Sequence, residues 1–155
     1  GFIFLGLMII DNEPFVIEYN VRLGDPETEA ILPRIKTDLL DLLDKTAKGQ
    51  LAEIDLEITD DFTATLVLAS GGYPGSYEKG KEISGLDTAG EKGIIFHAGT
   101  KLSYDNVITS GGRVLAVTSR SKDIRTAIKE VYESSENIKY AGKYNRNDIG
   151  KDMIG

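Results

Sequence analysis

The sequence contains no cysteine, no tryptophan and a single histidine, His97. Without cysteine the chain cannot form a disulfide, attack a substrate through a thiolate or hold zinc through cysteine ligands. The lack of cysteine fits a reducing compartment, and we expect a cytoplasmic protein. Long apolar runs are missing too: none approaches the roughly 20 residues of a membrane span, so we expect no membrane partner.

Positive charge is also scarce. Lys and Arg together number 18 against 25 Asp and Glu, which gives a formal net charge of -7. Binding to a nucleic-acid backbone needs a basic face, so we expect no nucleic-acid partner. One local arginine could still bind the phosphate of a small substrate. The 155 residues suffice for one ordinary domain or two small ones.

The chain begins inside the apolar run "GFIFLGLMII", without a turn or cap before it. We therefore expect the native protein to continue upstream and this chain to be its C-terminal part. Residues 2–10 and 15–20 are predicted as strands, and "DNEP" between them has the composition of a turn. The two strands are expected to form an antiparallel hairpin.

Helical patterns follow the hairpin. Residues 27–35 indicate a short helix with Pro26 near its start. Residues 36–49 predict a longer helix that ends at Gly49. Its apolar stripe consists of four leucines: Leu39, Leu40, Leu42 and Leu43.

From about residue 50 onward, short apolar strands alternate with glycine-rich turns. The expected strands are "TATLVLAS", "GIIFHAGT", "NVITSGG" and "RVLAVTSR". A last helix over residues 121–138 is expected to be capped by Ser121 and to bury Ile124, Ala127, Ile128 and Val131. The predicted fold class is α+β, with a first domain over residues 1–49 and a small β-rich domain over residues 50–155.

Charged residues gather where the second strand ends, in "VIEYNVRLGDPETE". Glu18 and Asn20 are two apart on a strand, so their side chains point to the same face. A carboxylate and an amide oxygen suit Mg²⁺ or Mn²⁺. If the strand continues, Arg22 lies on the same side and could stabilise the charge of a transferring phosphoryl group. A solvated strand end is the alternative.

Several motifs together resemble one family. The run "VIEYNVRLGDPETEAILPRI" is similar to the end of the ATP-grasp domain in the phosphoribosylamine–glycine ligases, also called glycinamide ribonucleotide synthetases. The resemblance continues, in order, through "KTDLLDLL", "GGYPGSYEKGKEISGL", "FHAGT", "TSGGRVLAVT" and "YNRNDIG". It covers essentially the whole chain and implies the C-terminal end of an ATP-grasp domain followed by a small α+β domain.

The resemblance implies an ATP-dependent carboxylate–amine ligase of purine biosynthesis. Such an enzyme joins glycine to 5-phosphoribosylamine through a glycyl phosphate. The ATP-binding lobe of the family lies upstream, so we expect the chain alone to be inactive. The alternatives are another ATP-grasp carboxylate–amine ligase and a non-catalytic β-rich binding module. The Gly-Asp-Pro-Glu-Thr turn favours the phosphoribosylamine–glycine ligases over other ATP-grasp ligases.

The resemblance also assigns roles to residues. Glu18 and Asn20 match the family's metal ligands, and Arg22 matches a position near the reacting groups. Gly24, Asp25 and Pro26 would shape the substrate side, although turn formation and helix capping could also explain Asp25, Glu27 and Thr28.

The strand before the metal pair departs from related ATP-grasp enzymes. Many of these carry a third metal-binding carboxylate at the position of Gly6, which has no side chain to bind a metal. Met8 matches a position against the adenine, but a plain core methionine is the alternative.

Other polar residues have structural explanations. His97 is expected to make a structural hydrogen bond near a turn. The glycines of "GGYPGSY" are expected to allow positive φ, and "SGGR" is expected to be a hairpin turn with a solvated or ion-paired Arg113. The segment with Arg146 and Asp148 could close over the metal and substrate site or simply cap the end of the chain.

Overall fold

The computed structural model describes residues 1–155, and its contacts divide the chain into two compact units. We call Gly1–Thr59 the hairpin unit and Asp60–Gly155 the sheet unit. The division falls later than the predicted boundary after residue 49, because residues 50–59 return to the hairpin unit. Lys36 N donates to Glu57 O at 2.9 Å, and Thr59 N donates to Arg34 O at 2.8 Å.

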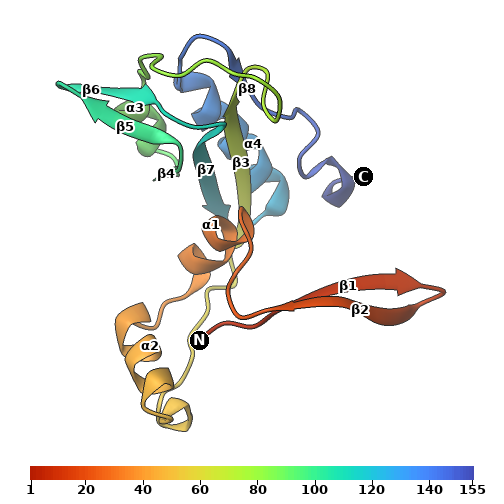
Figure 1. Cartoon of the computed structure of the whole chain (residues 1–155). Coiled ribbons are helices and arrows are strands. Elements are labelled where there is room, and N and C mark those ends of the chain that lie inside the picture. The colour runs from red at the N-terminus through yellow and green to blue at the C-terminus, as the bar shows by residue number, and fades with distance from the viewer. The chain divides into compact units, whose positions relative to one another are not determined.

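The hairpin unit begins with two long antiparallel strands, β1 (Phe4–Ile10) and β2 (Glu13–Asn20), which have no third strand beside them (Figure 1). Asp11 and Asn12 form the turn between them with φ values of 50° and 65°. A two-residue hairpin turn favours positive φ, and Asp and Asn tolerate that conformation well. The predicted hairpin is confirmed.

Short helices follow the hairpin: α1 (Glu27–Ile31), η1 (Leu32–Arg34), α2 (Leu39–Ala47) and η2 (Leu51–Glu53). The Asp38 carboxylate caps α2 by accepting a hydrogen bond from Asp41 N. Gly49 follows α2 with φ of 72°, as expected of a glycine just past a helix end. Of the predicted leucine stripe, Leu42 is buried, whereas Leu40 is 78% exposed.

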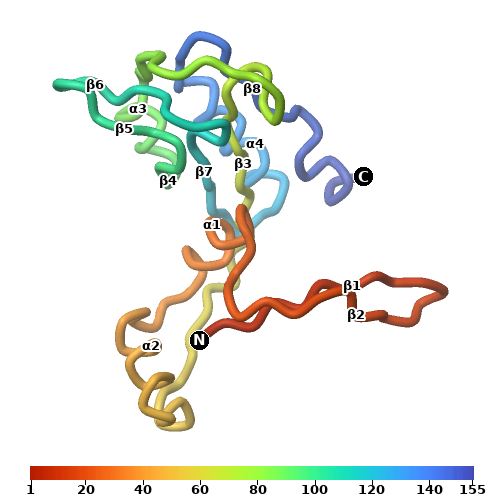
Figure 2. The backbone as a smooth tube through the Cα atoms, in the orientation of Figure 1, coloured from red at the N-terminus to blue at the C-terminus, as the bar shows by residue number.

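The sheet unit contains a four-stranded antiparallel sheet with the strand order β4-β7-β3-β8. Its strands are β3 (Phe62–Ser70), β4 (Ile94–His97), β7 (Arg113–Ser121) and β8 (Lys143–Tyr144). A separate antiparallel pair consists of β5 (Thr100–Ser103) and β6 (Asn106–Thr109). Figure 2 follows the chain through the long loop of residues 71–85 that leads from β3 toward α3 (Leu86–Gly90).

Helix α4 (Ile124–Asn137) packs against β3 and β7 and buries the apolar face that the sequence predicts. Ala127 and Val131 are fully buried, and Ile128 is nearly so. The core between helix and sheet also contains Leu66, Leu68, Val114, Leu115, Val117 and Ile138. None of the helices is both long enough and apolar enough to cross a membrane.

Two local expectations in the sheet unit are wrong. Asp123, not Ser121, caps α4: its carboxylate accepts a hydrogen bond from Thr126 N, whereas the Ser121 hydroxyl accepts one from Asp123 N. The "SGGR" segment is not a hairpin turn, because β6 pairs with β5 while β7 pairs with β3 and β4. It is a crossover between two sheets. Ser110 N and Gly111 N both donate to Gly99 O there.

Candidate metal and nucleotide site

The hairpin brings Glu18 and Asn20 together at the end of β2. Asn20 Nδ2 donates to Glu18 Oε1 at 3.0 Å, so both side chains do share one face. Glu18 is exposed and Asn20 is half-buried. Neither side chain makes another hydrogen bond or an ion pair, which leaves Glu18 Oε2 and Asn20 Oδ1 available for a ligand.

The register of the hairpin adds Gly6 to this face. The pairs Phe4–Asn20 and Gly6–Glu18 lie directly across the ladder, and the register shifts between Gly6 and Leu7. Leu7 pairs with Val16, so Ile17 is an extra residue in β2, that is, a β-bulge. The bulge lies immediately before Glu18.

The donor set fits a hard divalent cation. One carboxylate and one amide oxygen are the ligand types of Mg²⁺ and Mn²⁺, and Mg²⁺ commonly takes only one or two protein ligands and completes its shell with water and phosphate oxygens. No group of three or more His, Cys, Asp or Glu side chains is placed to hold a metal. Any metal held by Glu18 and Asn20 would therefore take its remaining ligands from water, the nucleotide or other protein segments.

Arg22 does not lie on the strand. The ladder ends at the Phe4–Asn20 pair, and the chain bends at Val21 and Arg22. Arg22 Nη1 donates to the carbonyl of Leu23 at 3.1 Å, and the side chain is exposed. Strand alternation therefore does not place Arg22 beside Glu18, because the strand ends before Arg22. The catalytic role of Arg22 stays a prediction from the resemblance.

The turn after β2 is held by Thr28. Its hydroxyl donates to Gly24 O at 2.6 Å, and its backbone N–H donates to the same oxygen at 3.1 Å. A Cβ at Gly24 would require the flexible carboxylate of Glu27 to move away. Pro26 stands at the N-cap of α1 without a side-chain cap. The two hydrogen bonds give Thr28 a structural role. The substrate role of Gly24, Asp25 and Pro26 stays a prediction.

Met8 is not a core methionine within this chain. It is 51% exposed and lies across the ladder from Phe15, which is 54% exposed. Because β1 alternates regularly, Met8 faces the same way as Gly6 and therefore as Glu18. An apolar pair thus lies next to the polar pair on one face, and contact of Met8 with a nucleotide base stays a prediction.

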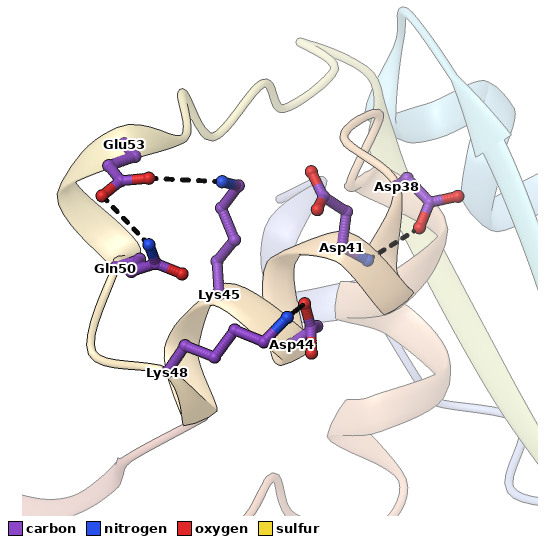
Figure 3. A network of polar contacts seen from close by, with 7 residues as sticks. All are labelled: Asp38, Asp41, Asp44, Lys45, Lys48, Gln50 and Glu53. Carbon is purple, nitrogen blue, oxygen red and sulfur yellow. Dashed lines mark hydrogen bonds and ion pairs between the residues drawn. The ribbon is translucent and has the colours of Figure 1, made fainter.

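Helix α2 and the segments next to it carry several carboxylates, of which those of Asp38, Asp44 and Glu53 have partners (Figure 3). Asp38 caps the helix, and Asp44 pairs with Lys48 at 2.7 Å. Glu53, just beyond the helix, accepts from Lys45 and Gln50 at 3.4 and 3.3 Å. The network stabilises α2 and η2, and nothing in it indicates a ligand.

The polar candidates of the sheet unit have local partners too. His97 Nδ1 lies 2.9 Å from Thr100 Oγ1, so the predicted structural hydrogen bond near a turn is confirmed. Arg146 Nε and Nη2 form a two-point pair with Asp148, at 2.9 and 2.6 Å. This pairing raises the pKa of Arg146 and lowers that of Asp148. Arg113 is exposed at the start of β7.

One hollow of about 180 Å³ was not anticipated from the sequence. It is lined by Ser70, Gly71, Glu78, Lys81, Ala141 and Gly142. Glu78 and Lys81 form an ion pair at 2.5 Å, which lowers the pKa of Glu78. In the sequence, only the spacing of three residues between Glu78 and Lys81 could have indicated this ion pair, and that spacing is common on protein surfaces.

Comparisons with known proteins agree with this layout. Residues 63–152 match the family described as phosphoribosylglycinamide synthetase, C domain. The chain is 45% identical to the phosphoribosylamine–glycine ligase of Chlorobaculum tepidum over 97% of its own length and 36% of that protein. It is 44% identical to the bifunctional purine biosynthetic protein PUR2,5 of Pichia angusta, over 96% of the chain and 19% of that protein.

A solved structure is similar as well. The crystal structure of phosphoribosylamine–glycine ligase from Thermotoga maritima superposes with a TM-score of 0.82 and 38% identity. The match covers 96% of this chain and 37% of that one. The chain thus spans little more than a third of the length of these ligases. The family match extends over more than half of the chain, and the chain therefore belongs to the phosphoribosylglycinamide synthetase family, whose C domain it contains.

Proposed function

We propose that this chain is the C-terminal part of a cytoplasmic phosphoribosylamine–glycine ligase and supplies one side of its active site. Membership of the family and the names of the relatives support the reaction. The hydrogen-bonded pair of Glu18 and Asn20 supports the location, because it offers two hard oxygen ligands on one strand face.

The reaction proceeds in two steps. An oxygen of the glycine carboxylate takes the γ-phosphoryl group of ATP, which gives glycyl phosphate and ADP. The amine nitrogen of 5-phosphoribosylamine then attacks the acyl carbon, and the new amide bond forms as phosphate leaves with the electron pair of the broken C–O bond. The amine proton is released in this second step.

Glu18 and Asn20 would hold Mg²⁺ or Mn²⁺. Such an ion neutralises phosphate charge and aligns the γ-phosphoryl group for transfer. Within the chain, the Asn20 amide orients the Glu18 carboxylate, and Glu18 Oε2 and Asn20 Oδ1 would be the oxygens left to bind a hard cation. This orientation is the chain's own contribution to the step.

Other residues have proposed roles next to the pair. Arg22 would leave the carbonyl of Leu23 and stabilise charge on the transferring phosphoryl group. The backbone of Gly24, Asp25 and Pro26 would border the substrates, since Thr28 fixes that turn. Met8 would lie against the adenine.

The chain is proposed to be inactive by itself. It spans 36% of the length of the Chlorobaculum tepidum ligase, so most of that protein has no counterpart here. The glycine, phosphoribosylamine and ATP sites would be completed by residues of the longer ligase. We accordingly expect full activity only from that longer chain.

The test is an assay of ADP formation by the full-length ligase that carries this sequence. Turnover should require both glycine and 5-phosphoribosylamine, and Glu18→Ala should lower it by about a hundredfold or more. Glu18→Gln, which keeps the size of the side chain, should lose most of the activity as well. Turnover with a different carboxylate or amine instead would favour another carboxylate–amine ligase. Wild-type turnover in Glu18→Ala would contradict the proposed metal pair.

A further inference from the structure

Gly6 lies directly across the hairpin from Glu18. A Cβ built on Gly6 would come within 3.0 Å of Glu18 Cγ, while the Glu18 backbone N and O would both be 3.7 Å away. The backbone distances are ordinary van der Waals contacts, so only the side chain is too close. A side chain at position 6 would therefore require Glu18 Cγ to move by a few tenths of an ångström.

The backbone of Gly6 does not itself require glycine. Its φ lies outside the left-handed region, unlike the φ of +72° at Gly49 or +75° at Gly142. A glycine inside a strand weakens that strand and often marks a close approach. Here the close approach is that of Glu18, and no other neighbour lies within the same distance.

The bulge lies at the same point of the ladder. Ile17 is the extra residue of β2, immediately before Glu18, and the register shifts immediately after Gly6. A bulge changes the direction of the side chains next to it. The bulge at Ile17 thus precedes Glu18 along β2, and Gly6, which has no side chain, lies across from it. Glu18 Oε1 accepts a hydrogen bond from Asn20 Nδ2 at 3.0 Å.

We propose that Gly6 is a positioning residue for the metal pair: its missing side chain leaves the space in which Glu18 is held against Asn20, ready to bind a divalent cation. The proposal rests on the proposed function, because it assumes that Glu18 and Asn20 are ligands. Gly6 would thus raise the metal affinity of the pair although it binds nothing itself.

The experiment measures Mn²⁺ binding by the full-length ligase in the presence of ADP, with free Mn²⁺ followed by electron paramagnetic resonance. Gly6→Ala should weaken Mn²⁺ binding by about tenfold, the effect typical of a residue that supports a metal ligand. Gly6→Val, with a larger side chain, should weaken it further. Leu7→Val is the control on the opposite face of the same strand and should bind Mn²⁺ as the unchanged protein does.

A double-mutant cycle separates positioning from general damage. In a Glu18→Ala background, Gly6→Ala should cause no further loss of affinity, because there is no longer a Glu18 Cγ to displace. Thermal unfolding by circular dichroism should show Gly6→Ala to be as stable as the unchanged protein or more so, since alanine suits a strand better than glycine.

Two failures are distinguishable. If Glu18→Ala binds Mn²⁺ as before, the metal pair of the proposed function is wrong. If Glu18→Ala weakens binding but Gly6→Ala does not, or if the two losses simply add, the role of Gly6 is overturned while the metal pair stands.

Discussion

Lys143 closes the C-terminal end of α4 from a neighbouring strand. Its Nζ donates to Ser135 O at 2.7 Å and to Ile138 O at 2.9 Å. The last carbonyls of a helix lack helical partners and carry partial negative charge, so an ammonium group there is stabilising. Partial burial, with some help from nearby Lys139, lowers the pKa of Lys143.

Replacing Lys143 by methionine should lower the free energy of unfolding by about 1–3 kcal/mol, because two carbonyls lose a charged donor. Urea unfolding of the chain, followed by circular dichroism, measures the change. Lys139→Met is the matched control, because Lys139 is exposed and its side chain makes no hydrogen bond. An equal effect of both substitutions would contradict the capping role of Lys143.

Tyr140 connects the C-terminal segment to the central sheet. Its buried hydroxyl donates to Ala69 O at 2.9 Å, and burial raises the pKa of the phenol well above its usual value of 10.0. The folded chain therefore keeps the Tyr140 proton at a pH where the unfolded chain releases it. The stability that follows is fully present below about pH 10 and is lost as the pH rises further.

We therefore expect the free energy of unfolding to fall less steeply above about pH 10 in Tyr140→Phe than in the unchanged chain. At neutral pH the substitution should cost about 1 kcal/mol for the lost hydrogen bond. Denaturant unfolding at a series of pH values measures both effects. Tyr104→Phe serves as control, because Tyr104 is 99% exposed. A shallower alkaline decline in that control as well would argue against Tyr140 as the cause.

At this scale the sequence predicts what strand alternation alone decides. Glu18 and Asn20 are two apart, and any extended backbone places them on one face. Arg22 could not be placed in the same way, because β2 pairs with β1 only as far as Asn20. Its partner there is Phe4, the first residue of β1. The contact of Gly6 with Glu18 depends on cross-strand register, which the bulge at Ile17 alters.

The N-terminus of helix α4 is capped by Asp123 and not by the predicted Ser121. The Asp123 carboxylate accepts hydrogen bonds from Thr126 Oγ1 and Thr126 N, both at 2.8 Å. These bonds lower the pKa of Asp123, with the hydroxyl as the larger cause. The stability that the carboxylate contributes is present above its unfolded pKa of about 3.8 and is lost as the pH falls through the lower folded pKa.

Asp123→Ala should lower the melting temperature at pH 7, whereas Asp123→Asn should keep most of it, because asparagine is also a good cap. At a pH of about 2.5 the difference in melting temperature between Asp123→Ala and the unchanged chain should be smaller than at pH 7, because the carboxylate of the unfolded chain is then largely protonated. Thermal unfolding by circular dichroism at both pH values is the measurement. A gap that stays constant with pH would rule out the charged cap.

Elements built from local signals could be predicted. The hairpin, the short helices and the apolar face of α4 follow from turn residues and periodicity within a few positions. Strand partners could not be predicted, because they are chosen by distant residues. "SGGR" has the composition of a hairpin turn, yet β6 and β7 join different sheets. The edge strand β8 pairs with β3, although it lies in the C-terminal segment, for which the sequence predicts no strand.

The two units differ in how they bury their strands. In the sheet unit, Leu66, Leu68 and Val117 are buried between sheet and helix. In the hairpin unit every residue of β2 except Asn20 is exposed. A two-stranded hairpin without a covering layer is marginally stable in water. The free energies of local opening should therefore differ between the units.

Hydrogen exchange of the whole chain should be slower in β3 and β7 than in β1 and β2, by about a hundredfold or more. Mass spectrometry of exchanged peptides resolves these segments. Leu68→Ala should reduce protection across the sheet unit, at a cost of about 2–5 kcal/mol, because Leu68 is fully buried. Exchange in the hairpin should not change. Equal loss of protection in both units would show that they unfold as one.

The hairpin also bears on how the chain behaves in concentrated solution. Strand β1, with the sequence FLGLMII, has neither charge nor proline, and its outer edge has no partner strand. Open, uncharged edges of this kind promote strand addition between molecules. Separated from a longer ligase, the chain should therefore self-associate as its concentration rises, and a lysine introduced at Ile9 should delay the aggregation.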